Sequence, residues 1–182
     1  YINVLEQLGV TDVANHGLHI ETSKEWNDEV FRFYESQGVM PRDKIIGFNI
    51  GSAVPEKRWP AERFADVADY FGNKGYKTVF FGGPMDLDMV KPVVEQMKTS
   101  PIVATGAFKL GPLAAAMKWC DLLITNDSGP MHVAISQGVP IVALYGPSNP
   151  FFYGPYQAKS IVLESMDHYE IGKSMKQVIK EG

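Results

Sequence analysis

Short apolar segments alternate with longer amphipathic segments along most of the chain. The apolar segments are rich in β-branched residues, as buried strands are, and the longer segments repeat their apolar positions with the spacing of a helix. Glycine, proline and serine separate the segments. The expected strands are residues 18–20, 45–50, 78–81, 102–103, 122–125, 141–145 and 160–163. The expected helices are residues 2–9, 24–37, 60–71, 87–98, 112–119, 131–137 and 171–180.

Strands that alternate with helices predict a parallel α/β sheet, because each crossover places a helix on one face of the sheet. Open sheets of this kind bind ligands in the crevice beyond the carboxyl ends of their strands. Functional residues are therefore expected in the loops that follow the strands. These loops are residues 51–58, 82–86, 105–110, 126–131 and 146–157.

Composition narrows the class of protein. The 182 residues, 45% of them hydrophobic, are enough for one domain to bury a core without disulfides. The single cysteine, Cys120, adjoins an apolar run and is interpreted as a buried side chain, so a reducing cytoplasm is the expected compartment. A net charge of −4 argues against nucleic acid as a partner. The chain opens at Tyr1 with the pattern of a helix end, so we expect a longer protein.

The most informative segment is residues 126–132, Asn-Asp-Ser-Gly-Pro-Met-His, which links an expected buried strand to an expected helix. Ser128 and Gly129 would present backbone N–H groups at the positive end of that helix, an arrangement that binds phosphate. His132, in the first helical turn, could donate to a phosphate or sugar oxygen. The alternative is structural: Asp127 or Ser128 caps the helix, and His132 is an ordinary packed histidine.

A second segment, residues 51–60, has the same place after a strand and before a helix. Lys57 and Arg58 are adjacent cations near the positive end of that helix, which is unfavourable unless an anion compensates for them. A bound anionic ligand would do so. The alternative is a solvated charge pair beside a packed Trp59.

Metal chemistry has weaker support in the sequence. Asp86 and Asp88 open a helix after Gly-Gly-Pro, where carboxylates usually complement the helix dipole, so we interpret them as capping residues. The cysteine and histidines form no transition-metal motif, and no P-loop or complete dinucleotide-binding fingerprint is present.

Four motifs occur in a fixed order: Lys-Arg-Trp-Pro at residues 57–60, Phe-Gly-Gly-Pro at 81–84, the segment 126–132, and Tyr-Gly-Pro-Ser at 145–148. In this order and spacing they resemble the bacterial ADP-heptose:lipopolysaccharide heptosyltransferases, glycosyltransferase family nine. The resemblance implies a two-domain GT-B enzyme, of which this chain is the C-terminal half, a Rossmann-like doubly wound parallel sheet. Residues 1–40 are then an interdomain segment with a leading helix and strand, and residues 41–182 a nucleotide-sugar-binding domain.

The resemblance also implies roles for single residues. Ser52, Lys57, Ser128, Gly129 and His132 would hold the donor diphosphate, with the backbone N–H groups of Ser128 and Gly129 taking part. Asp127 would face the donor sugar. The nucleoside would lie at Gly83, Asp86 and Phe108, although some relatives have a glutamate in the turn where this chain has Pro-Met-Asp.

The implied reaction is direct displacement with inversion at the sugar C1, in which Lys57, helix N-termini and His132 neutralise the leaving diphosphate without a metal cofactor. The general base and the glycolipid acceptor site belong to the absent N-terminal half, so no catalytic residue is assigned in this chain. The expected location is the cytoplasm, with at most peripheral association at the inner face of the inner membrane. Two alternatives stay open: a nucleotide-sugar epimerase of related architecture, and a non-catalytic nucleotide- or flavin-binding module.

Overall fold

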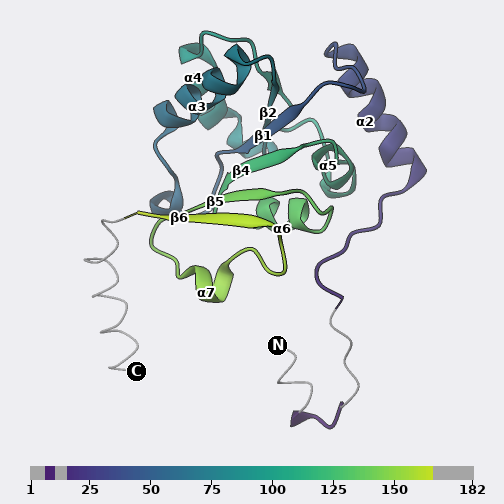
Figure 1. Ribbon diagram of the computed structural model, residues 1–182, viewed down its shortest axis with the longest axis vertical. Helices are drawn as coiled ribbons and strands as arrows, with labels where there is room; N and C mark the ends of the chain where they lie inside the picture. The colour runs from purple at the N-terminus through teal and green to yellow at the C-terminus, as the bar shows by residue number, and fades with distance from the viewer. Residues whose placement is uncertain (1–6, 11–15, 166–182) are drawn as a thin grey trace.

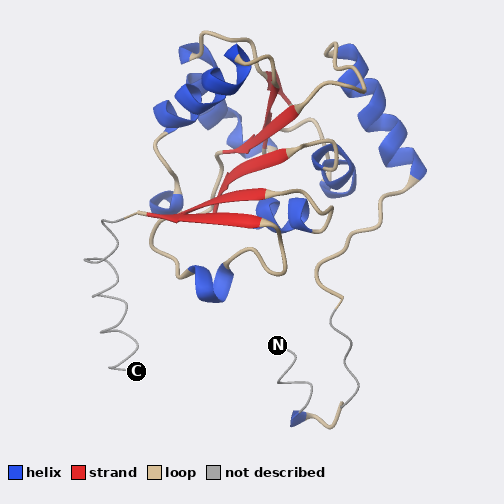
Figure 2. Cartoon of the chain, in the orientation of Figure 1, coloured by secondary structure: helices blue, strands red, loops and turns tan. Residues whose placement is uncertain are grey.

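The computed structural model describes residues 7–10 and 16–165, and its centre is a six-stranded parallel sheet (Figures 1 and 2). The strand order is β3-β2-β1-β4-β5-β6, with every neighbouring pair parallel. This is the doubly wound order of Rossmann-like domains. The strands are β1 (Ile45–Asn49), β2 (Lys77–Phe81), β3 (Ile102–Val103), β4 (Leu122–Asn126), β5 (Ile141–Tyr145) and β6 (Ser160–Glu164).

Helices cover both faces of the sheet, as the alternating pattern predicts (Figure 1). On one face lie α3 and α4, and on the other lie α5 and α6, with α2 packed against α5. The α-helices are α2 (Lys24–Ser36), α3 (Ala61–Asn73), α4 (Leu87–Gln96), α5 (Leu110–Met117), α6 (Gly129–Ile135) and α7 (Pro150–Tyr153). Two short 3₁₀ helices, η1 (Pro55–Lys57) and η2 (Pro84–Asp86), lie in the loops after β1 and β2.

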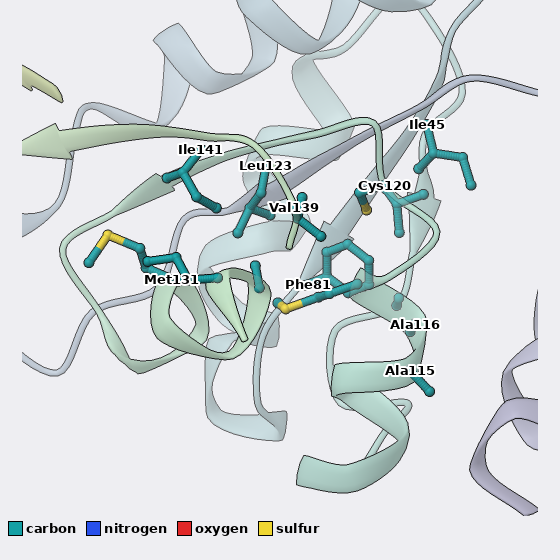
Figure 3. Close-up of a cluster of buried hydrophobic side chains, with 14 of the residues drawn as sticks. Ile45, Phe81, Ala115, Ala116, Cys120, Leu123, Met131, Val139 and Ile141 are labelled. Atoms are coloured by element: carbon teal, nitrogen blue, oxygen red, sulfur yellow. The ribbon is translucent and has the colours of Figure 1, made fainter. Parts of the chain in front are cut away.

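The core has two layers because successive side chains of a strand point to opposite faces. In β1, Ile45 joins the layer under α5 and α6, whereas Ile46 joins the layer under α3 and α4. Figure 3 shows Leu123 and Ile141 gathered with Met131 and other apolar side chains. Cys120 is buried in the same layer, and this burial raises the pKa of its thiol. Its interpretation as a buried side chain is confirmed.

Helix α2 begins where the sequence predicts. The side chain of Ser23 accepts a hydrogen bond from the backbone N–H of Trp26, the contact expected of an N-cap. The buried Tyr34 hydroxyl donates to the carbonyl of Ala116 at 3.1 Å, which joins α2 to α5. The helix stops before Gly38, whose positive φ of 68° suits glycine.

Three expectations differ from the structure or lie outside it. The strand at 18–20 is wrong: Gly17 has a φ of 72°, and the Ile20 carbonyl accepts from the Gln137 side chain instead of from a strand. Helix α7, which starts at Pro150 behind the Asn149 cap, was not expected. The helix at 171–180, and most of the one at 2–9, lie outside the described residues.

Candidate donor-binding site

The strand order brings together the loops that carry the predicted site. Since β1, β4 and β5 are adjacent, the loops after them leave the same edge of the sheet side by side. Lys57 comes from the first of these loops, Asp127 from the second and Ser148 from the third. The three residues form one cluster, although long stretches of chain separate them.

Asp127 is the centre of this cluster. Its Oδ2 atom lies 2.6 Å from Nζ of Lys57, and the Ser148 hydroxyl donates to the same oxygen at 2.5 Å. Only 6% of Asp127 is exposed. A carboxylate at this depth needs a cation or hydrogen-bond donors, and here it has both. Ser128, and not Asp127, is the N-cap residue of α6, and no side chain makes a capping bond there, so the alternative that Asp127 caps this helix is wrong.

Lys57 and Arg58, adjacent in sequence, have different partners. Lys57 turns to Asp127, with its Nζ also 5.7 Å from the centre of the Tyr153 ring. Arg58 turns back on its own loop, where Nε and Nη2 donate to the carbonyl of Ser52 at 2.9 and 2.7 Å. The alternative of a solvated charge pair is wrong for Lys57, which pairs with the buried Asp127, whereas Arg58 is exposed beside a packed Trp59, as that alternative expects. Lys57 faces the crevice, and Arg58 holds the loop in shape.

Ser52 is almost completely buried beneath this loop. Its hydroxyl lies 3.4 Å from the Asp127 carbonyl and accepts from the N–H of Val54 at the same distance. The structure thus places Ser52 against the backbone of the Asp127 segment, next to the Lys57–Asp127 pair.

Ser128, Gly129 and His132 occupy the first turn of α6. Ser128 is the N-cap residue but makes no side-chain capping bond, because its hydroxyl donates to the Asn126 carbonyl and accepts from Nδ2 of Asn49 at 2.8 Å. Apart from its chain neighbours and the backbone of its own helix, no heavy atom lies within 4 Å of where a Cβ of Gly129 would be, so this position is open. His132 is half-buried.

Two buried asparagines at the strand ends received no role from the sequence, although Asn126 opens the segment 126–132. Asn126, the last residue of β4, donates to the Ile50 carbonyl at 2.8 Å and accepts from the N–H of Trp59 at 3.0 Å, which joins the first two loops. Asn49, the last residue of β1, holds the Ser128 hydroxyl, and its own Oδ1 has no partner among the described residues. An asparagine at the end of a mostly apolar strand was the available signal.

The predicted nucleoside residues lie towards β2 and β3. Oδ2 of Asp86 accepts from the N–H of Gly83 at 2.7 Å, within η2. Asp86 and Asp88 stand at the start of α4, as expected, but Asp86 makes no side-chain capping bond to that helix. A Cβ on Gly51 would lie 2.5 Å from Oδ1 of Asp86, so this turn abuts the β1 loop. Phe108 packs edge-on against Phe33, with 4.9 Å between ring centres.

A cleft of about 510 Å³ opens beside this cluster. Lys57 is the one predicted binding residue in its wall, which continues over Arg58, Trp59 and Arg63 to the ends of β5 and β6. Tyr145 also lines it. Burial, together with the charge of Asp127, raises the pKa of the Tyr145 hydroxyl, which remains a donor to the Tyr153 carbonyl at 2.7 Å. The cleft has the size of a small-molecule site.

The described residues contain neither a membrane-spanning helix nor a metal-binding cluster. None of the helices there combines the length and the apolar character that crossing a bilayer requires. In the same part of the chain, no three acidic, histidine or cysteine side chains are grouped so that they could hold a metal ion.

Comparison with known proteins gives one consistent result. The model of glycosyltransferase family 9 (heptosyltransferase) matches residues 1–181. Lipopolysaccharide heptosyltransferase 2 of Escherichia coli is 34% identical over 130 residues, which are 69% of this chain and 37% of that protein. The chain thus spans well under half the length of this curated relative.

Solved structures agree. A family 9 glycosyl transferase from Veillonella parvula superimposes with a TM-score of 0.88 at 79% identity, covering 96% of this chain and 50% of the other. The Escherichia coli ADP-heptose lps heptosyltransferase II gives a TM-score of 0.71 at 30% identity, over 80% of this chain and 44% of the other. None of these proteins is an epimerase or a non-catalytic module, so neither alternative gains support.

Proposed function

The chain belongs to glycosyltransferase family 9, and we propose that it is the donor-binding half of an inverting enzyme. The proposed reaction transfers a heptose from ADP-heptose to a lipopolysaccharide core or related glycan. Relatives named as heptosyltransferases, and one named for ADP-heptose, support this choice of donor. A solved relative has about twice the length of this chain. In the proposed enzyme, the rest of the protein would supply the parts that this chain lacks.

The observation that carries the proposal is the Lys57–Asp127 pair at the carboxyl edge of the sheet. In the proposed complex, Lys57 and the N–H groups of Ser128 and Gly129 bind the diphosphate, with Ser52 and His132 beside them. Charge that develops on the leaving diphosphate is then neutralised by fixed protein groups, which is the main way enzymes stabilise such transition states. Asp127 accepts hydrogen bonds from sugar hydroxyls, and Gly83, Asp86 and Phe108 border the nucleoside.

The general base and the acceptor site are proposed to lie outside this chain. A base must come within about 3 Å of the attacking hydroxyl and be free to take its proton. Asp127 is poorly suited, because Lys57 and Ser148 already donate to its carboxylate. The division of the chain into an interdomain segment, residues 1–40, and a donor domain, residues 41–182, belongs to the same proposal.

The remaining parts of the proposal concern cofactor and location. Donor binding is proposed to need no metal cofactor, since Lys57 and backbone N–H groups supply the positive charge. The enzyme is proposed to work in the cytoplasm, where a glycolipid acceptor would bring it to the inner face of the inner membrane as a peripheral protein.

The test is calorimetry of the purified chain with ADP, followed by a transfer assay with a heptose donor and a lipopolysaccharide-core acceptor. We expect saturable ADP binding by the chain alone, no transfer product, and transfer once the preceding half of the protein is present. A chain that binds no ADP would refute the donor role. Turnover by the chain alone, abolished by Asp127→Asn, would refute the division between the halves.

A further inference from the structure

We propose that Ser148 is a positioning residue that stabilises the Asp127 carboxylate while Lys57 moves to the donor diphosphate. The inference rests on the proposed donor-binding function. Ser148 ends the Tyr-Gly-Pro-Ser motif at residues 145–148, and the sequence assigned it no role. Ser148 would affect donor binding indirectly, through its hydrogen bond to Asp127 and the ion pair of Asp127 with Lys57.

The geometry supports this because both donors share one oxygen atom. The Ser148 hydroxyl and the Lys57 ammonium group both donate to Oδ2 of Asp127, at 2.5 and 2.6 Å. Among the described residues, no other side chain donates to this carboxylate. Ser148 is itself only 9% exposed, so its hydroxyl proton has little access to water.

The ammonium group of Lys57 has three N–H donors but only one positive charge. Without a donor, this charge is neutralised by Asp127, and in the proposed complex the diphosphate draws the ammonium group towards itself. A buried carboxylate that loses its cation is strongly destabilised. The retained Ser148 hydrogen bond, which is charge-assisted and therefore strong, reduces that cost.

Neighbouring serines cannot take over this task. The Ser128 hydroxyl already donates to the Asn126 carbonyl, and the Ser52 hydroxyl lies against the backbone of Asp127 instead of its carboxylate. The segment that bears Ser148 also places the Tyr153 ring 5.7 Å from Nζ of Lys57. The loop after β5 therefore contacts both members of the pair.

The experiment measures ADP affinity by calorimetry for Ser148→Ala, Ser148→Thr and Ser148→Cys, each made with Asp127 intact and with Asp127→Asn. With Asp127 intact, we expect Ser148→Ala to weaken ADP binding roughly tenfold, the scale of one charge-assisted hydrogen bond. Ser148→Thr, which keeps the hydroxyl, should restore wild-type affinity, and Ser148→Cys, a weaker donor, should fall between. With Asp127→Asn, no charge needs stabilising, so Ser148→Ala should change affinity less than about twofold.

Ser136→Ala is the matched control, because Ser136, the C-cap residue of α6, is a similarly buried serine whose hydroxyl donates to the Val133 carbonyl and accepts from the Gln137 side chain, away from the Lys57–Asp127 pair. It should bind ADP as the wild type does. Thermal melts of every variant distinguish misfolding from weakened ADP binding. If Ser148→Ala does not fold, the ADP affinities of Ser148→Thr and Ser148→Cys test the positioning role. Equal losses with and without Asp127→Asn, or no loss in any Ser148 variant, would overturn the positioning role. A wild-type chain that binds no ADP would instead overturn the proposed function.

Discussion

The Nζ atom of Lys57 lies 2.6 Å from Oδ2 of Asp127, and 70 positions of sequence separate the two residues. Because Asp127 is almost completely buried, the pair is more than a surface ion pair. It sets the starting state from which a donor diphosphate must bind.

Lys57→Ala should weaken ADP binding by about 1.5 to 3 kcal/mol, the range for a hydrogen bond to a charged group. The melting temperature should also fall, because Asp127 is left buried without its cation. Calorimetry and thermal melts measure the two effects. Lys118→Ala, which removes an exposed lysine ahead of β4, is the control and should change neither. Unchanged ADP affinity in Lys57→Ala would exclude Lys57 from the site.

Asp127→Asn should affect the binding of two ligands to different extents. Lys57 no longer has a competing carboxylate, so ADP alone should bind several-fold more tightly than to the wild type. ADP-heptose should lose part of this gain, since an amide accepts sugar hydroxyls less strongly than a carboxylate does. The measurement is the ratio of the two dissociation constants. An unchanged ratio would contradict the assignment of Asp127 to the donor sugar.

Gly129→Ala should separate binding from folding. Its Cβ would meet no atom within 4 Å and the residue has no positive φ, so the melting temperature should stay the same. The added methyl group would nevertheless obstruct a phosphate that approaches the backbone N–H. We expect at least a tenfold loss of ADP affinity, on the order of one lost charge-assisted hydrogen bond. Wild-type affinity would mean that the diphosphate lies elsewhere, for instance in the cleft beyond Arg58.

Chelation should leave donor binding intact. Oδ2 of Asp86 already accepts the N–H of Gly83, and the proposed groups for the diphosphate are Lys57 and backbone amides. ADP titrations with and without EDTA should give the same dissociation constant. A loss of affinity in EDTA that magnesium or manganese restores would return Asp86 and Asp88 to the role of metal ligands.

Asp69→Asn should destabilise the fold in a pH-dependent way. Burial would raise the pKa of Asp69, but hydrogen bonds from the Lys98 N–H, the Thr99 hydroxyl and the Thr99 N–H outweigh it and hold the pKa below its usual value of 3.8. A lowered folded-state pKa stabilises the protein above pH 3.8, and this contribution is lost as the pH falls through the lowered value.

At pH 7 the loss in Asp69→Asn should be roughly 1 kcal/mol, as for a helix-capping carboxylate. Denaturant unfolding from pH 7 down to pH 3 should show the difference from wild type shrinking below pH 4. Asp66→Asn, on the exposed face of the same helix, is the control and should cost little at any pH. A difference independent of pH would point to lost packing instead of the carboxylate.

Most of the fold could be predicted because its signals are local. Each of the strands β1 to β6 coincides with an expected apolar segment, and α2 to α6 match expected helices, with ends that differ by a few residues. Strand propensity, helical spacing, Ser23 as a cap and Gly38 as a terminator all act within one or two turns of chain. Where the local signal was weakest, at 18–20 and in the four-residue helix α7, prediction failed.

The general place of the site could be predicted as well, since a parallel sheet binds ligands at the carboxyl ends of its strands. The sequence by itself therefore determined the fold class, the ligand-facing edge and the loops on it. Only the tertiary structure decided which side chains of those loops meet. Ser148 reaches Asp127 across 21 residues, Lys57 across 70, and Asn126 joins Ile50 to Trp59. These contacts depend on the strand order, which places β1 between β2 and β4. They also depend on how deeply a carboxylate is buried. The periodicity of a single segment determines neither the strand order nor the burial.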